Sequence, residues 1–402
     1  MLTFEEARKR LLARAKPFGV ERVHLSRAIG RVLAESVVAP LDLPAFSYSA
    51  MDGYALRLET LGGAGPFTLP VAGESRTGHV PAPLVPGTAA RIFTGAEIPE
   101  GADAVVAQED VERRDDAIVV RTVPRPGQHI RRAGEDIAWG ETALERGKRL
   151  GPPALALLSS LDIVEVAVAR APRVTVVATG DELRPAGAAH EAGKIPDALS
   201  LPIAELARAA GASVRIAPFV LDEPGATEVA LERALDGTDL LVTIGGVSVG
   251  DHDLVRPALE ARGVALDFWK VAIKPGKPLA SGVHARSGAV VLALPGNPAS
   301  AIITFALFGV PLLRAMQGDA RPLPRTIPLP LAAPYRKKAG RLEFVRALVE
   351  DGPRGPLVRP LENQASGALT SLAWADALAL IPAEAEALAE GALVEVLHTQ
   401  DL

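Results

Sequence analysis

The sequence predicts a multi-domain protein built around a central three-layer α/β domain with a mostly parallel sheet. The chain has 402 residues, which exceeds the size at which a single hydrophobic core stops growing. Between Arg173 and Gly318, apolar strand-like runs alternate with helix-like segments, as in a parallel sheet covered on both faces. Short strand-like runs broken by turn residues lie before and after this region.

The expected domains follow from these changes of pattern. We expect an N-terminal helical and linker domain, an inserted small β domain, the α/β domain and a small all-β domain at the C-terminus. Their expected bounds are 1–45 with 140–172, 46–139, 173–318 and 319–402.

The N-terminal half begins with a predicted helix. Thr3 and Glu6 have the spacing of a capping box, and apolar residues follow at helical intervals. From Phe67 to Thr142, the runs FTLPVAG, AARIFTG, ADAVVAQ and AIVVRTV are separated by turn signals, as in a small β domain. A second helix is expected with Pro152 and Pro153 in its first turn.

The α/β region alternates strand by strand and helix by helix. VTVVATG, VRIAPFV, LLVTIGG and AVVLALPG are runs of the buried-strand type, and SLPIAELARAAG, EPGATEVALERALDG, HDLVRPALEARG and NPASAIITFALFGVPLLRAMQG are helix-like. Pro257 is tolerated only near a helix start, which places the start of the third helix close to Asp253. Past Gly318, prolines and short alternating runs predict the C-terminal β domain.

Composition and charge argue against several classes of function. The net charge of −5 argues against a general nucleic-acid binder, and the lack of cysteine excludes disulfides and cysteine-ligated zinc. We find no apolar run that approaches the ~20 residues of a membrane helix, and the charged opening segment lacks the apolar core of a signal peptide. We therefore expect a cytoplasmic protein with neither a nucleic-acid nor a membrane partner.

Three loops in the α/β region carry residues suited to an anionic ligand. The first is Gly245–Gly250, the second holds Lys274 and Lys277 on a proline–glycine turn, and the third is Leu294–Pro298, whose last two residues fit the N-cap and first position of a helix. In an open α/β sheet, ligands bind beyond the carboxyl ends of the strands. Glycines and helix starts would offer free N–H groups there. Each loop alone is also compatible with a plain turn or cap.

Acidic residues form a second set. Glu182 follows the strand VTVVATG directly, and Asp52 and Asp136 lie in glycine-flanked turns. Turn aspartates usually serve the backbone, and Asp253 is open to the same reading as an N-cap. Lysine loops and carboxylates together suit a phosphorylated substrate whose metal ion the acids hold.

Several strings occur in the order found in one known family. They are SAMDGYA at 49–55, IFTGA at 92–96, GADAVV at 101–106, GED at 134–136, TGDEL at 179–183, GGVSVG at 245–250, WKVAIKPGKP at 269–278 and LPGNPASA at 294–301. Together they resemble the molybdopterin molybdenumtransferases, which complete the molybdenum cofactor and are related to the E domain of gephyrin. EFVR and ALTSLAWADALALIP extend the resemblance towards the C-terminus.

The resemblance implies a reaction and a set of site residues. Molybdenum from molybdate would enter adenylylated molybdopterin, with Mg²⁺, cleavage of the phosphoanhydride and release of AMP, in a homodimer whose site is shared between subunits. The implied catalytic residues are Asp52, Thr94, Asp136, Glu182, Asp222, Asp253, Lys270 and Lys274. Substrate binding is implied for Gly245, Gly246, Ser248, Gly250, Lys277, Pro295, Gly296, Asn297 and Pro298, and Mg²⁺ binding for Glu182 and Asp253.

Three positions depart from the family pattern. Ser47 stands where aspartate is usual, Leu199 where asparagine is usual, and Ile244 where serine or threonine is usual. Each change alters a side-chain hydrogen-bonding group, worth ~1 kcal/mol if it is used. An alternative therefore stays open: a homologue that binds the pterin, or acts as a scaffold, with weak or no turnover.

Overall fold

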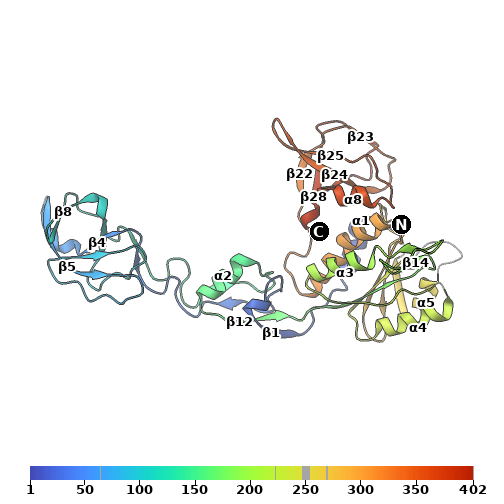
Figure 1. Cartoon of the computed structure of the whole chain (residues 1–402), viewed down its shortest axis with the longest axis horizontal. Helices are drawn as coiled ribbons and strands as arrows, with labels where there is room; N and C mark the ends of the chain where they lie inside the picture. The colour runs from blue at the N-terminus through green and yellow to red at the C-terminus, as the bar shows by residue number, and fades with distance from the viewer. Residues whose placement is uncertain (64, 222, 247–253, 269, 402) are drawn as a thin grey trace. The chain divides into compact units, whose positions relative to one another are not determined.

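The chain folds into two compact units, which are described separately. The computed structural model describes residues 1–402 except 64, 222, 247–253, 269 and 402 (Figure 1). The first unit comprises residues 1–35, 146–151 and 167–402, and the second comprises 36–145 and 152–166. The predicted fold class is confirmed, because an α/β domain, an inserted β domain and a C-terminal β domain are all present.

The α/β domain contains a six-stranded sheet in the order β16-β13-β17-β21-β20-β18. Its strands are β13 (Arg173–Ala178), β16 (Ser213–Ile216), β17 (Leu240–Ile244), β18 (Val264–Phe268), β20 (Ala280–His284) and β21 (Val290–Leu294). The first four strands of the order are parallel, and only β20 runs antiparallel to its two neighbours. The carboxyl ends of β13, β17, β18 and β21 therefore lie at the same edge of the sheet.

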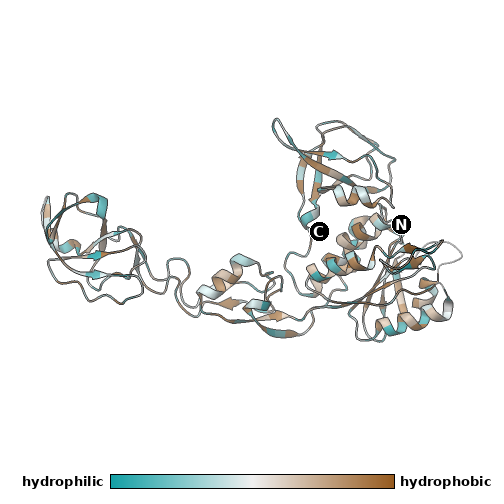
Figure 2. Cartoon of the chain, viewed as in Figure 1, coloured by the Kyte–Doolittle hydropathy of each residue, from teal (hydrophilic) through white to brown (hydrophobic). Residues whose placement is uncertain are grey.

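Helices cover both faces of this sheet, which gives the predicted three layers. The helices of the domain are α3 (Ser200–Ala209), α4 (Pro224–Leu235), α5 (Val255–Ala261), α6 (Pro298–Thr304) and α7 (Val310–Met316). Side chains alternate along each buried strand. Val176 packs in one core cluster with α3, α6 and α7, whereas Val177 packs in another with α4 and α5. In Figure 2 the strands of this domain are mostly brown, whereas its helices carry both teal and brown residues.

The first helix, α1 (Phe4–Leu12), belongs to the same core. Its N-terminus has the predicted capping box, in which Glu6 N donates to Thr3 Oγ1 and Thr3 N donates to Glu6 Oε2. The Phe4 ring packs edge-on against Phe308 and Phe344, with centroids 5.2 and 5.1 Å away. The N-terminal helix thus joins the α/β domain to the C-terminal strands.

The helical stretch Pro298–Met316 corrects one expectation. A π-helical turn, η4 (Phe305–Gly309), separates α6 from α7, at a point where Pro311 has no N–H to donate to the preceding turn. The stretch has 19 residues and a mean hydropathy of 1.7, so it meets the length and composition of a membrane span. Our expectation that no apolar run comes close to this length was wrong. The stretch is 83 % buried inside the fold, as in the core helix of a globular protein.

The C-terminal domain is a second six-stranded sheet, in the order β19-β24-β26-β28-β22, with β25 paired to β24. Its elements are β19 (Ile273–Lys274), β22 (Ile327–Pro330), β24 (Leu342–Gly352), β25 (Gly355–Pro360), α8 (Leu369–Trp374), β26 (Ala377–Ile381) and β28 (Leu393–His398). A two-stranded pair, β23 (Tyr335–Arg336) and β27 (Ala387–Leu388), completes it. The edge strand β19 comes from the lysine loop of the α/β domain, so the two domains share a sheet.

The second unit is built around a third six-stranded sheet, in the order β7-β4-β6-β5-β9-β8. Its elements are β2 (Val37–Val38), β3 (Tyr48–Ser49), β4 (Gly53–Leu56), η2 (Leu58–Thr60), β5 (Phe67–Ser75), β6 (Ala89–Ile92), β7 (Ala104–Ala107), η3 (Gln108–Asp110), β8 (Val111–Arg114), β9 (Ala117–Val120), β10 (Ile130–Arg131), β11 (Thr142–Leu144) and α2 (Pro152–Ser160). Tyr54, Leu56, Val106 and Ile118 lie in its core.

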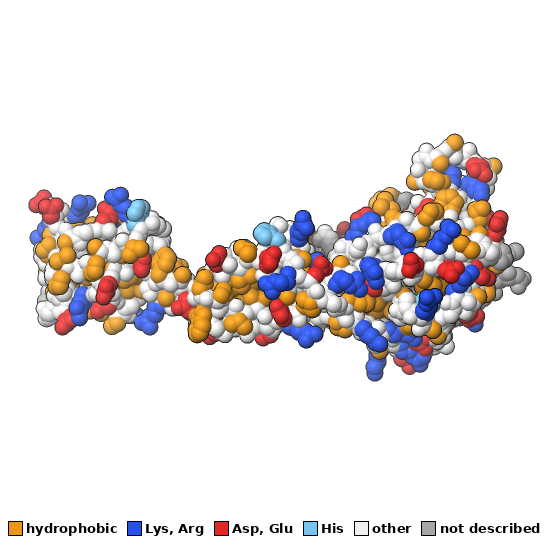
Figure 3. Space-filling model, turned by 90° about the horizontal axis from the view of Figure 1, so that it is seen from below, with side chains coloured by type: hydrophobic (Ala, Val, Ile, Leu, Met, Phe, Trp, Pro, Cys, Tyr) orange, Lys and Arg blue, Asp and Glu red, His pale blue; other side chains and the backbone are white. Residues whose placement is uncertain are grey.

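Short elements complete the described chain. They are β1 (Val20–His24), η1 (Leu25–Arg27), β12 (Glu165–Ala169), β14 (Leu183–Arg184), β15 (Ile195–Pro196) and η5 (Thr399–Asp401). Acidic and basic side chains are interspersed over the face of each unit that Figure 3 presents, in keeping with the small net charge of −5.

Candidate functional site

The loops after β13, β17 and β21 are held side by side at the carboxyl edge of the α/β sheet. Thr179 N donates to the Ile244 carbonyl at 2.9 Å, and Gly245 N donates to the Leu294 carbonyl at 3.1 Å. These bonds continue the ladder of the parallel strands beyond their ends. Thr179, Gly245 and Leu294 are far apart in the sequence, but these bonds make them neighbours at one edge of the sheet. The sequence predicts this for the first and third loops.

Two glycines of the first loop have no room for a side chain. Gly245 and Gly246 have φ of +89° and +61°, where glycine is strongly favoured. A Cβ on Gly245 would lie 2.6 Å from the Thr179 carbonyl oxygen, and one on Gly246 would lie 2.2 Å from Val255 Cγ2. A Cβ on Gly296 would lie 3.6 Å from Gly245 Cα. We call Thr179, Gly245, Gly246 and Gly296 the glycine cradle.

The glycine cradle offers hydrogen-bond donors to a ligand. Among the described residues, Gly246, Gly296 and Asn297 find no acceptor for their backbone N–H groups. Thr179 is 5 % exposed, and its hydroxyl has no hydrogen-bond partner within the described part of the chain. Buried hydroxyls are normally paired. Backbone N–H groups without a partner, in a glycine-rich loop and at a helix start, are donors that an oxyanion such as a phosphate can satisfy.

The loop after β21 begins a helix as predicted, but the hydrogen bonds at this helix start differ from those expected. Asn297 is the N-cap of α6 and Pro298 is its first residue, yet the Asn297 side chain accepts no capping hydrogen bond. The Ala299 N–H, at a helix start where free N–H groups were expected, donates to the Ser366 carbonyl of the C-terminal domain at 2.9 Å. Pro295 is buried beside the cradle.

The lysine loop, between β18 and β20, carries Lys270, Lys274 and Lys277. These three side chains differ in exposure and in their contacts. Lys274 lies in β19, and its Nζ donates to Glu343 Oε1 at 3.2 Å. Lys277 is exposed and Lys270 half-buried, and neither forms an ion pair with a described residue. The peptide bond between Lys274 and Pro275 is cis. Gly276 lies against α6, where a Cβ would be 2.1 Å from Thr304 Cγ2.

Glu182 lies at the rim of the same edge. The carboxylate folds back over Gly180, so that a Cβ there would lie 2.4 Å from Glu182 Oε2. Its backbone carbonyl accepts from Ile195 N at 2.6 Å, at the base of the β14–β15 pair. The side chain is exposed, so it is available to a ligand. The carbonyl of the neighbouring Asp181 accepts a hydrogen bond from Lys194 Nζ.

Four further predicted site residues lie outside the described residues. They are Asp222, Ser248, Gly250 and Asp253. The helix that follows Asp253, α5, begins at Val255 with Leu254 at its N-cap and Pro257 in its first turn. The predicted helix and the place of its proline are confirmed, whereas the alternative that Asp253 is its N-cap is wrong.

The Mg²⁺ expected from the resemblance fits this edge only in part. Within the described residues, no group of three histidine, aspartate or glutamate side chains is placed to hold a metal ion. Mg²⁺ usually keeps several waters and binds through one or two carboxylates plus substrate phosphates. An exposed Glu182 beside the glycine cradle meets that simpler requirement, and Asp253, the other predicted ligand, is outside the described residues.

In the second unit, Asp52 and Thr94 come together as a pair. Asp52 Oδ1 accepts from Thr94 N at 2.7 Å and from Thr94 Oγ1 at 2.8 Å. The Thr94 N–H and then its hydroxyl lower the pKa of Asp52, because both donate to the charged form. Asp136 is exposed in a turn, where its N–H donates to the Leu43 carbonyl.

The three departures from the family pattern have local explanations. Ser47 Oγ accepts from Ala133 N at 3.1 Å, so the position keeps a hydrogen-bond acceptor. Ile244 and Leu199 are 3 % and 7 % exposed and pack in the main core of the α/β domain. Both apolar side chains therefore lie inside the core and not at an open surface.

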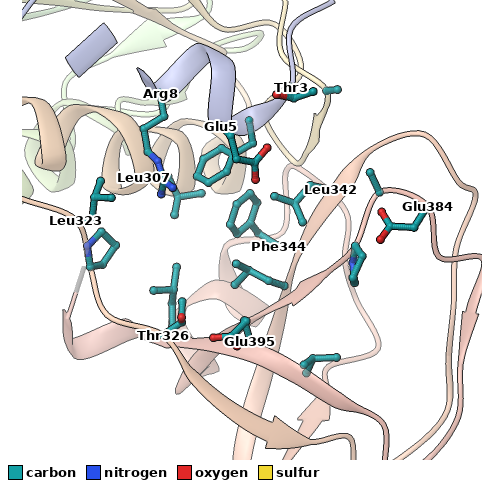
Figure 4. A pocket seen from close by; sticks show the side chains of 18 of the residues that line it. Thr3, Glu5, Arg8, Leu307, Leu323, Thr326, Leu342, Phe344, Glu384 and Glu395 are labelled. Atoms are coloured by element: carbon teal, nitrogen blue, oxygen red, sulfur yellow. The ribbon is translucent and has the colours of Figure 1, made fainter. Parts of the chain in front are cut away.

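A separate cavity of about 650 Å³ lies between α1, the α/β domain and the C-terminal sheet. Figure 4 shows Glu5 and Arg8 reaching towards it from α1, and Leu342 and Phe344 from β24. None of the predicted site residues lines it.

Two residues that contribute to the candidate site were not predicted. Thr179 belongs to the string TGDEL, in which only Glu182 was predicted to be a site residue. Glu343, in EFVR, lies 69 residues after Lys274. No sequence spacing indicates such a contact, which depends on how two domains pack.

Three family models match the chain in order. The MoeA N-terminal region (domains I and II) matches residues 2–161, a probable molybdopterin binding domain matches 175–315, and the MoeA C-terminal region (domain IV) matches 328–398.

Relatives match over nearly the whole length. A molybdopterin molybdenumtransferase of Haemophilus influenzae is 39 % identical and covers 89 % of this chain and 88 % of its own. Molybdopterin molybdenumtransferase 2 of Mycobacterium tuberculosis is 38 % identical, with 93 % and 94 % covered. The crystal structure of a molybdopterin biosynthesis MoeA protein from Pyrococcus horikoshii OT3 matches with a TM-score of 0.85 at 31 % identity, over 99 % and 100 % of the chains. The chain belongs to the molybdopterin molybdenumtransferase family.

Proposed function

We propose that this protein inserts molybdenum into molybdopterin as the completing step of molybdenum cofactor biosynthesis. In detail, adenylylated molybdopterin and molybdate are the substrates, the phosphoanhydride bond is cleaved and AMP leaves. The observation that supports this most is the glycine cradle, which offers donors to an anionic substrate and has the exposed carboxylate of Glu182 at its rim. The loop between β18 and β20, which carries Lys274, starts from the same edge of the sheet.

The residues of the chain have separate tasks in this proposal. The N–H groups of Gly246 and Gly296 and the Thr179 hydroxyl bind phosphate oxygens, because each lacks a partner among the described residues. The ammonium group of Lys274 offsets the negative charge that the two anionic substrates bring together. Glu182 and Asp253 are the residues that would hold Mg²⁺. Mg²⁺, when bound, supplies charge neutralisation of the phosphoanhydride.

The remaining features of the proposal rest on the family resemblance. We propose a cytoplasmic homodimer, in which Asp52, Thr94 and Asp136 complete the site of the other copy. A monomer in sedimentation velocity at assay concentration would contradict the dimer.

The test is molybdate-dependent release of AMP by the purified chain. Adenylylated molybdopterin, molybdate and Mg²⁺ are supplied, and AMP is quantified by chromatography. Glu182→Gln and Asp52→Asn should each lower the rate by at least ~100-fold. The control is Glu205→Gln, an exposed position of α3 paired with Arg208, which should retain the full rate.

Two outcomes would contradict the proposed function. Wild-type AMP release no faster than that of Glu182→Gln would exclude turnover by this site. Tight binding of the pterin nucleotide with no molybdate-dependent AMP would select the alternative of a pterin-binding homologue. The structure weakens the motive for that alternative, because Ser47 retains an acceptor and the side chains of Leu199 and Ile244 are buried in the core.

A further inference from the structure

A carboxylate of the C-terminal domain lies in register with the site lysine. Strand β19 pairs with β24 in parallel, with Ile273 opposite Leu342 and Lys274 opposite Glu343. Opposed residues of a parallel pair point to the same face of the sheet, and successive residues alternate. Leu342 and Phe344 line the cavity beside α1, so Glu343 points to the opposite face, towards Lys274.

Glu343 is buried and both of its oxygens are occupied. Its side chain is 5 % exposed. Oε1 accepts from Lys274 Nζ at 3.2 Å, and Oε2 accepts from the Tyr335 hydroxyl at 3.1 Å. A buried carboxylate is tolerated only when it is paired and hydrogen-bonded. Lys274 and Tyr335 together meet that requirement.

Tyr335 keeps its proton for this contact. Burial, followed by the charge of Glu343, raises the pKa of the Tyr335 phenol above its usual value. The hydroxyl therefore stays a donor over the whole physiological range and fixes the orientation of the carboxylate. Tyr335 lies in β23, which is paired with β27 of the same domain, so its position is set by the C-terminal fold.

Lys274 is held by its backbone and by one of its three ammonium donors. Its backbone is fixed by the pairing with β24, and its side chain is 42 % exposed. An ammonium group has three donors, of which one is occupied by Glu343. The other two are open to solvent or to a ligand, with the long side chain already ordered. Ordering a lysine side chain in advance saves much of its rotamer entropy, which is otherwise lost on binding.

We propose that Glu343, itself oriented by Tyr335, is a positioning residue for Lys274 in molybdenum transfer. This inference rests on the proposed function, in which Lys274 contacts the substrate. Its consequence is that the C-terminal domain contributes to the active site through a residue that does not touch the substrate. A purely structural role, in which the ion pair only joins two domains, predicts a lower Tm for Glu343→Gln with wild-type kcat and KM.

The experiment is a double-mutant cycle on the full-length protein. Glu343→Gln, Lys274→Met and the double variant are compared with the wild type by kcat and KM for adenylylated molybdopterin, and by calorimetric affinity for the pterin nucleotide. Glu343→Gln should lower kcat/KM about tenfold, and Glu343→Asp should recover part of the loss. In the Lys274→Met background, Glu343→Gln should cause no further loss, because its effect acts through the missing ammonium.

A matched control lies on the same strand. Glu350 of β24 is paired with Arg359 at 2.7 Å and is partly exposed, so Glu350→Gln removes a carboxylate without touching Lys274 and should leave kcat and KM unchanged. If Glu343→Gln fails to fold, Tyr335→Phe replaces it. That change removes only the hydroxyl on Oε2, and about a threefold loss, absent in the Lys274→Met background, is expected.

The outcomes separate this inference from the proposed function. Equal losses from Glu343→Gln with and without Lys274 would overturn the positioning role, as would a wild-type rate in Glu343→Gln. If the wild type releases no AMP, the proposed function fails, and the cycle on pterin-nucleotide affinity still decides the inference: non-additive losses support it and additive ones overturn it.

Discussion

Replacing Thr179 by valine should have opposite effects on the free protein and on its complex. Valine has nearly the shape of threonine, so Thr179→Val creates no cavity. The Thr179 hydroxyl is buried and has no partner among the described residues. Leaving such a group unpaired costs ~1–3 kcal/mol. We therefore expect the variant to be more stable without ligand, by about 1 kcal/mol, or about 2–4 °C in Tm.

Ligand binding should change in the other direction. A hydrogen bond to a charged group contributes about 1.5–3 kcal/mol. If the Thr179 hydroxyl donates to a phosphate of the pterin nucleotide, its loss should weaken binding by about 10–150-fold, since 1.4 kcal/mol is a factor of ten. Calorimetric titration measures this Kd, and thermal unfolding of the free protein measures the stability.

Thr243→Val is the matched control. The Thr243 hydroxyl is also buried and unpaired within the described chain, but it lies inside β17 and not in the loop after it. That variant should gain stability and keep the wild-type affinity. Equal affinity of the two variants for the pterin nucleotide would refute the assignment of Thr179 to the ligand.

Two further predictions concern single contacts. Gly246→Ala should lower Tm, because φ is +61° and the new Cβ would lie 2.2 Å from Val255 Cγ2, whereas Gly296→Ala, with 3.6 Å of space, should not; similar thermal unfolding of both would contradict the steric reasoning. Thr94→Val should raise the pKa of Asp52 towards its usual 3.8. Because this pKa is lowered in the fold, the stabilisation by Asp52 is present above pH 3.8 and is lost as the pH falls through the folded pKa. The Thr94→Val variant should lose this stabilisation at a higher pH than the wild type. An unchanged NMR titration of the Asp52 carboxyl would contradict the conclusion that the Thr94 hydroxyl lowers its pKa.

Local patterns were sufficient to predict most elements of the fold. The capping box of Thr3 and Glu6, the buried strand runs and the alternation of strands with helices all correspond to observed elements, because each depends on neighbours within about ten residues. The prediction that no apolar run approaches the length of a membrane helix was wrong for Pro298–Met316. A buried core helix and a membrane span have similar apolar compositions.

The sequence by itself determined that glycines, lysines and carboxylates follow the strands of a parallel sheet, since strand ends and turn residues are local features. Only the tertiary structure decided how these groups are used. Lys274 is paired with Glu343, and the Ala299 N–H with the Ser366 carbonyl, while the Thr179 hydroxyl is left unpaired. These partners are chosen by the packing of one domain on another, across separations that no local pattern encodes. Burial then decides which groups stay available to a ligand.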